Sequence, residues 1–423
     1  MRVQSIYFYK KTDTMKRSFV TIGSCKLILT FSFVSVLGSG CISQNNPNAP
    51  TTPGTQPAVQ VTLDTIQTPG TPTTGKKKIK VAILLDTSNS MDGLIDQAKS
   101  QLWKIINELA KAKCENERPD LEIALYEYGN DGLSSAEGYI RQVSMFINDL
   151  DKISEQLFSL RTNGGNEFCG QVIHTSLKQL QWSDGNSDLQ LIFIAGNEPF
   201  TQGPVAYATA CKEAVQKDVV VNTIFCGNFD MGINTSWKTG ADFTGGNYMS
   251  IEQDRKTVYI ETPYDKEIAQ MNESLNGTYI GYGYLGIISK ENQKKQDENA
   301  KTYGWSNNAN RIVSKSSHLY KNESWDLVDA SGSKEFDITK VKETDLPKEL
   351  QGKTTVQKQK YIEDKKNERA KVNASIGELN TKRVEYIAQK EKEMGQDTSN
   401  SLDAAMIAAI KSKAKTKNFT FDN

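Results

Sequence analysis

The chain has 423 residues, of which 37% are hydrophobic and 24% are charged, and its formal net charge at pH 7 is zero. A chain of this length and composition can bury a full core, whereas the balanced charge argues against the basic footprint of a nucleic-acid-binding domain. With only two histidines in the sequence, a histidine-based catalytic triad or zinc site is difficult to build.

The first forty residues have the pattern of an export signal. Basic residues precede an apolar run at 27–37, which has the length of a signal-peptide core and is too short to span a bilayer stably. Small residues ending in Cys41 follow and resemble a lipobox, although the usual leucine lies one position early, at Leu37. We therefore predict a lipoprotein signal peptide at 1–41 with Cys41 lipidated. The alternatives are a plain secretory signal and an uncleaved anchor.

Residues 42–76 are rich in Ser, Asn, Pro, Thr, Gly and Gln and carry almost no charge before the lysines at the end. Such a segment cannot bury a core and is typical of a disordered tether. A lipid, a spacer and a folded domain in this order predict a protein of the cell envelope. It would be anchored to a membrane, on the periplasmic side or at the cell surface.

From residue 77 to about 285, nearly continuous apolar runs alternate with helical patterns. This alternation predicts an α/β domain with a doubly wound, mostly parallel, Rossmann-like sheet. Strands are expected at 76–85, 121–128, 189–194, 219–225 and 248–251, with an edge strand at 139–146, and helices are expected at 94–109, 150–160, 168–180 and 205–216.

The motif Asp86-x-Ser88-x-Ser90 directly follows the first expected strand. One carboxylate and two hydroxyls on such a turn are hard oxygen ligands, suited to Mg²⁺, Ca²⁺ or Mn²⁺. The alternative is that these side chains only cap the next helix. At this position the motif resembles the metal-ion-dependent adhesion site of von Willebrand factor type A (VWA) domains, and the resemblance covers about residues 78–280.

The resemblance implies two further site loops, and both depart from the family pattern. Glu167 stands where the family has a threonine, and Gly196 replaces the aspartate of the third loop, with Asn197 and Glu198 beside it. Two carboxylates with several neutral oxygens still suit Mg²⁺ or Ca²⁺. The alternative is a metal-free cluster of loops held by hydrogen bonds. The predicted ligands are Asp86, Ser88, Ser90, Glu167 and Asn197.

The expected α/β domain contains four cysteines, and no Cys-x-x-Cys motif occurs. An even number in an exported protein permits two disulfides. Cys169 and Cys226 both lie near the ligand-facing ends of their expected elements and are the predicted pair. The alternative is that all four are buried thiols.

Residues 286–423 are predicted to form a helical C-terminal arm that proteolysis separates from a core near 76–285. Apolar residues recur at helical spacing over 354–394, which indicates a long helix in a helical hairpin or coiled coil. A shorter helix is expected at 402–413. The segment around Trp325 is either a docking segment or packed locally.

These features together favour a binding module over an enzyme. The sequence shows no nucleophile–base pair, phosphate loop or cofactor fingerprint. The resemblance implies a lipid-anchored VWA protein that binds a protein partner at the envelope, through a divalent-metal site on its loop face. The alternative is a structural envelope protein that acts through its helical arm and has a vestigial metal site.

Overall fold

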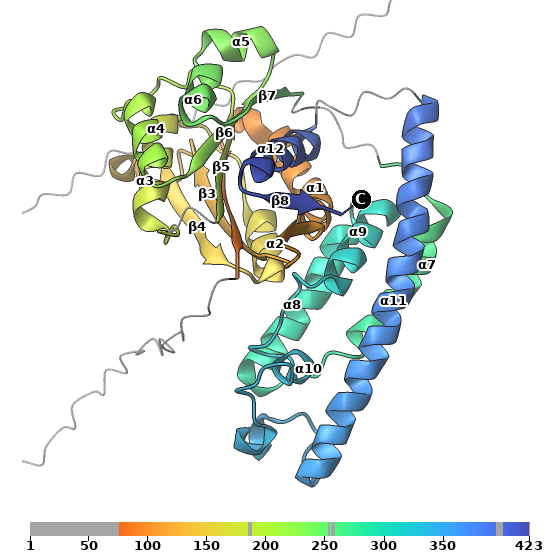
Figure 1. Cartoon of the computed structure of the whole chain (residues 1–423). Helices are drawn as coiled ribbons and strands as arrows, with labels where there is room; N and C mark the ends of the chain where they lie inside the picture. The colour runs from red at the N-terminus through yellow and green to blue at the C-terminus, as the bar shows by residue number, and fades with distance from the viewer. Residues whose placement is uncertain (1–75, 185–187, 253, 255–258, 395–400, 423) are drawn as a thin grey trace, which may run out of the picture. The chain divides into compact units, whose positions relative to one another are not determined.

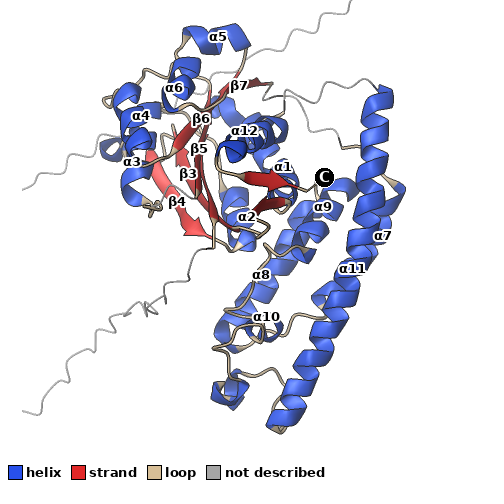
Figure 2. Ribbon diagram, in the orientation of Figure 1, coloured by secondary structure: helices blue, strands red, loops and turns tan. Residues whose placement is uncertain are grey.

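The computed structural model describes residues 76–184, 188–252, 254, 259–394 and 401–422 (Figure 1). The predicted signal peptide, Cys41 and the tether up to residue 75 lie outside the described residues. A six-stranded sheet flanked by helices occupies the first part of the described chain, and long helices follow (Figure 2). Within the described part, no helix has both the length and the apolar character needed to cross a bilayer.

The sheet has the order β4-β3-β1-β5-β6-β7, with β4 antiparallel to β3 and the other neighbours parallel. All residues of β5 and β6 are buried, as expected for strands covered on both faces. The predicted doubly wound, mostly parallel sheet is therefore confirmed. The strands are β1 Lys78–Asp86, β3 Asp120–Tyr128, β4 Ile140–Ile147, β5 Leu189–Gly196, β6 Val220–Cys226 and β7 Tyr248–Ile251.

Helices cover both faces because the strand side chains alternate between two cores. On β1, Val81 and Leu85 belong to the core under α1 and α2, whereas Ala82 and Leu84 belong to the core under α3, α4 and α6. A short helix, α5, follows β6. The helices are α1 Asp92–Leu109, α2 Leu150–Ser159, α3 Cys169–Gln179, α4 Tyr207–Gln216, α5 Phe229–Asn234 and α6 Trp237–Thr244, with 3-10 turns η1 Asn89–Met91 and η2 Ser135–Glu137.

The chain then leaves the sheet to form the helical arm. Along α11 the buried positions recur every seven residues, alternating isoleucine with arginine, and α11 packs on α7 and α9. Trp325 is buried beside Tyr279, with ring centroids 5.8 Å apart, so this segment packs against the stretch of chain that precedes α8 and not onto its own helix. In the structure the arm begins earlier than predicted, since α7 packs on α9 and α11, and it comprises α7 Pro263–Asn276, α8 Gly283–Lys301, α9 Trp305–Ser316, α10 Leu327–Ala330, η3 Ile338–Lys340, η4 Glu343–Asp345 and α11 Thr355–Met394.

The last residues return to the sheet, which the sequence did not indicate. α12 (Leu402–Thr416) packs beside α1 and against β5, β6 and β7, where Met406 and Ile410 join the α1 core. Strand β8 (Phe419–Phe421) pairs with β2 (Ala112–Cys114). The expected boundary at residue 285 therefore does not separate the described chain into a sheet domain and an independent tail.

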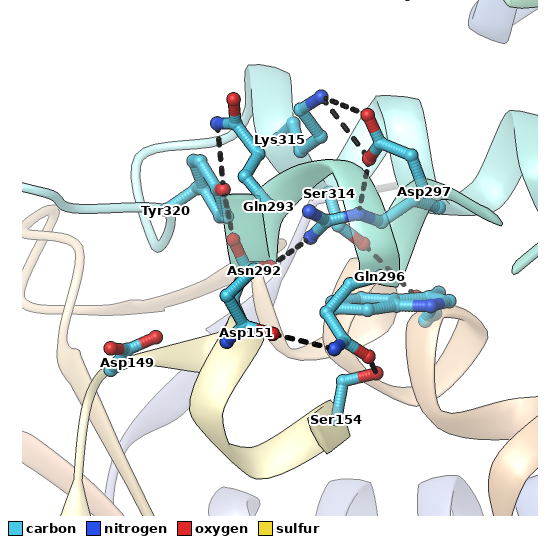
Figure 3. A network of polar contacts seen from close by, with 12 residues as sticks. Asp149, Asp151, Ser154, Asn292, Gln293, Gln296, Asp297, Ser314, Lys315 and Tyr320 are labelled. Carbon is cyan, nitrogen blue, oxygen red and sulfur yellow. Dashed lines mark hydrogen bonds and ion pairs between the residues drawn. The ribbon is translucent and has the colours of Figure 1, made fainter. Parts of the chain in front are cut away.

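A buried ionic network also joins the arm to the sheet domain (Figure 3). Arg311 of α9 is fully buried and pairs with Asp151 of α2 at 2.6 Å and with Asp297 of α8 at 3.0 Å. Lys315 pairs with Asp297 at 3.0 Å. Burial lowers the pKa of Lys315 to about 8, although Asp297 opposes that shift. Buried charges of this kind require partners, so the arm and the sheet domain depend on each other here.

Candidate functional site

The predicted site lies at the carboxyl edge of the sheet, where the strand order reverses. Asp86 is the last residue of β1 and Gly196 is the last residue of β5, its parallel neighbour. In open α/β sheets, the crevice outside the strand ends at this switch point is the usual ligand site. The fold therefore places the candidate residues where a ligand is expected.

The structure brings the five predicted residues together. The Ser88 amide donates to Asp86 Oδ1 at 2.7 Å, and the hydroxyls of Ser88 and Ser90 are 3.2 Å apart. Asn197 Nδ2 donates to Ser90 Oγ at 3.0 Å. Glu167 is buried close to Asp86, since a Cβ built on the intervening Gly129 would lie 2.7 Å from Glu167 Cγ and 2.8 Å from Asp86 Oδ1.

Ser88 does not play the capping role that was the alternative interpretation. Ser88 precedes the 3-10 turn η1, and Met91 precedes α1, but neither side chain makes a capping hydrogen bond. The hydroxyl of Ser88 instead faces that of Ser90, whose side chain is exposed. The Ser88 hydroxyl is therefore buried beside the Asp86 carboxylate, and the Ser90 hydroxyl lies next to it at the exposed side of the site.

Three buried oxygens of the site have no hydrogen-bond partner: Asp86 Oδ2, Glu167 Oε2 and Asn197 Oδ1. Burial raises the pKa of Asp86 well above its usual range, and the charge of Glu167 raises it further. Burial also raises the pKa of Glu167, while its hydrogen-bonded contact with Asp86 acts in the opposite direction. Two buried carboxylates that each have an oxygen without a donor require a compensating positive charge, either a shared proton or a cation.

The donor set fits a hard divalent cation. Within the described ranges, no group of three or more His, Cys, Asp or Glu side chains is arranged to hold a metal ion. A cation here would depend on two carboxylates, Asp86 and Glu167, with neutral oxygens from Ser88, Ser90 and Asn197 and with water. Mg²⁺ is commonly held by one or two carboxylates with several waters, so two carboxylates with neutral oxygens and water are a suitable set of ligands for it.

Tyr128 is a site residue that the sequence interpretation missed. A Cβ built on Gly196 would lie 2.5 Å from the Tyr128 hydroxyl oxygen and 3.1 Å from Asp86 Oδ2. The hydroxyl donates to the Ala195 carbonyl at 3.0 Å, and burial raises its pKa well above the usual range. Tyr128 therefore occupies the space next to Asp86 that an aspartate at position 196 would need. The Tyr-Gly step at the end of β3 was the available sequence signal.

The second loop is held by backbone contacts. The Asn163 amide donates to the Thr87 carbonyl at 2.9 Å, and the Asp131 amide donates to the Gly164 carbonyl. Gly165 lies so close to the Gly129 carbonyl that a side chain would collide with it. The glycines thus allow two loops of this chain to approach each other. The resulting rigid support fixes Glu167 beside Asp86.

The predicted Cys169–Cys226 disulfide is wrong for this structure. Both residues are free, buried cysteines. Cys169 begins α3 and packs in the core on one face of the sheet, whereas Cys226 ends β6 and packs in the core on the other face. The sheet therefore separates the two thiols. Burial raises the pKa of both, so they are weak nucleophiles.

The strand order, the antiparallel edge strand and the Asp86-x-Ser88-x-Ser90 turn define an α/β domain of the VWA-like class. Solved structures similar to this chain include the VWA domain of SpRpn10, at 17% identity over 41% of this chain and 87% of that chain, with a TM-score of 0.32.

Two further similar structures come from Bacteroides. The conserved hypothetical protein BatB from Bacteroides thetaiotaomicron is 14% identical over 41% of this chain and 90% of that chain, with a TM-score of 0.32. An aerotolerance-related membrane protein from Bacteroides fragilis is 14% identical over 42% and 93%, with a TM-score of 0.29. These likenesses concern the fold alone. No protein-family model and no curated protein sequence matches the chain.

Proposed function

We propose that this protein is a lipid-anchored binding module of the cell envelope, which captures a protein partner on the loop face of its VWA-like domain. In this proposal a divalent cation, Mg²⁺ or Ca²⁺, is held by Asp86 and Glu167, with Ser88, Ser90 and Asn197 supplying neutral oxygens. The observation that carries the proposal is the convergence of three buried, unpartnered oxygens at the carboxyl edge of the sheet.

The position of these groups favours access by a partner. Asp86 and Glu167 form a buried acidic floor, while Ser90 is exposed and Asn197 is half-buried. A cation on this floor would keep its solvent-facing positions for water or for oxygen atoms of a partner. The buried carboxylates of Asp86 and Glu167 supply the charge, and the accessible Ser90 and Asn197 leave the site open to a partner, which suits reversible binding.

Binding also suits the chemistry of the site better than catalysis. The thiols nearest the acid pair, Cys169 and Cys226, are buried with raised pKa values, which disfavours the reactive thiolate. The Tyr128 hydroxyl is buried and donates to a backbone carbonyl, so it is committed to structure. We therefore infer a non-enzymatic role for this site.

A thermal scan with added Mg²⁺, Ca²⁺ and Mn²⁺ tests the metal. A cation that binds only the folded state stabilises it by about 2.7 kcal/mol at a hundredfold excess over Kd. We expect Asp86→Asn to abolish the shift, while the matched variant Asp230→Asn, at an exposed acidic position on α5, retains it. If none of the three cations at millimolar concentration moves the wild-type melting curve, the site does not bind a metal.

The second candidate is a structural envelope protein that acts through its arm. The observation that favours it is the set of large apolar side chains exposed where α8 begins. Crosslinking and pull-down from membranes separates the candidates. Asp86→Ala should lose the captured partner if the loop face binds it, and should retain the partner if the arm does.

A further inference from the structure

Four large apolar side chains are exposed close together in the first turns of α8. The exposed fractions are 77% for Tyr284, 54% for Leu285, 64% for Ile287 and 43% for Ile288. We call these four residues the α8 patch. Single exposed apolar residues are common on soluble proteins, whereas a contiguous group of them is typical of a surface that binds a protein or a membrane.

The chain directly before the α8 patch is held in place by hydrogen bonds to the segment around Trp325 and Asp326. The Ile280 amide donates to Asp326 Oδ1 at 2.6 Å, and the Tyr282 amide donates to the Trp325 carbonyl at 2.9 Å. Gly281 and Gly286 lie in direct backbone contact, which a side chain at either position would prevent. The fold therefore fixes this turn while its apolar side chains remain outside the core.

We propose that the α8 patch lies against the lipid bilayer. Tyrosine is enriched at membrane–water interfaces, and exposed leucine and isoleucine side chains are stabilised when apolar lipid removes them from water. The neighbouring turn η4 contacts α8, and exposed charges of both signs lie in and around this turn: the lysines Lys340, Lys342, Lys348 and Lys353, and the acids Glu343, Asp345 and Glu349. Because the charges around this turn are mixed in sign, the contact with the bilayer depends on the apolar side chains of the α8 patch.

This inference rests on the proposed attachment at Cys41. Between Cys41 and Lys76 lie 34 residues, and a chain of that length spans at most about 110–120 Å. The distance between the lipid and the domain therefore does not prevent the α8 patch from touching the membrane. A second contact point would hold the folded domain at the bilayer surface, where one chain alone leaves it free to turn.

Site-specific fluorescence tests the contact directly. The full chain with Cys25→Ser and Cys41→Ser carries one added thiol, Leu285→Cys, labelled with an environment-sensitive nitrobenzoxadiazole dye. The four cysteines of the folded domain are buried and remain unlabelled. The matched control is Met145→Cys, a 66% exposed position on β4. The probes are vesicles of phosphatidylethanolamine and phosphatidylglycerol, with and without brominated acyl chains.

We expect the dye at 285, and not the dye at 145, to shift to the blue with vesicles and to be quenched by brominated lipid. Ile287→Ser with Ile288→Ser should lower vesicle binding about tenfold or more, since one large buried apolar side chain contributes about tenfold. Val215→Ser, at a 53% exposed position on α4, is the control. The proposal would be overturned if the dye at 285 does not respond to vesicles. It would also be overturned if the blue shift appears without vesicles when the protein concentration is raised. Palmitate labelling of the wild type tests the Cys41 anchor independently.

Discussion

Replacing Arg311 by methionine should destabilise the sheet domain and the arm together. The side chain is fully buried, pairs with Asp151 and Asp297, and lies over the Trp103 ring with its guanidinium carbon 4.4 Å from the centroid. Removing one partner of a buried ion pair costs about 3–5 kcal/mol, because the remaining charges stay buried. Asp297 keeps Lys315, so the main uncompensated charge is that of Asp151.

Urea denaturation followed by circular dichroism measures this loss. We expect one cooperative transition with a lower midpoint, and we expect Asp151→Asn in the same chain to restore part of the stability by removing the unpaired charge. The control is Lys238→Met, which breaks an exposed pair with Asp242 and should cost about 0.5 kcal/mol or less. A loss below about 1 kcal/mol, or an arm that melts separately while the sheet domain is unchanged, would refute the shared core.

Three other predictions concern the anchor, the acid pair and the thiols. A clickable palmitate should label the wild type, and Cys41→Ser should abolish the label; an unlabelled wild type contradicts the anchor. Because the pKa of Asp86 is raised in the folded state, proton binding at Asp86 favours the folded, metal-free protein at low pH. This contribution to the free energy of unfolding is lost as pH rises above the ordinary carboxyl range. Mg²⁺ competes with that proton, so its effect on Tm should be larger at about pH 8 than at about pH 5, and equal shifts would contradict a shared proton. In a chain with Cys25→Ser and Cys41→Ser, four thiols should react with Ellman's reagent only after unfolding; a count of two would indicate a disulfide.

The strands could be predicted from the sequence because their signal is local. Each parallel strand is a short apolar run next to a helical pattern, and the predicted edge strand and last strand lie within one residue of β4 and β7. The clustering of the candidate residues could be predicted for the same reason, since Asp86 ends β1 and the loops of parallel strands meet at one edge.

The docking of the arm could not be predicted because its signal is not local. Arg311 and Lys315 occur in a polar stretch that is typical of a solvated helix, and only their partners on other helices explain their burial. Likewise, α12 has a short apolar stripe whose partner is α1, about 300 residues earlier in the chain. Periodicity identifies an apolar face but not the element that covers it.

The departures from the family pattern at the site are related to each other. Tyr128 occupies the space beside Asp86 where a side chain at position 196 would lie, so position 196 is glycine. Position 196 therefore offers no carboxylate beside Asp86 Oδ2, while Glu167 of the second loop lies on the Oδ1 side of Asp86. Glu167 is thus the acidic side chain that raises the pKa of Asp86 in this site. A cation held here would therefore lie nearer the second loop, and the face it offers to a partner would be bounded by Ser90 and Asn197.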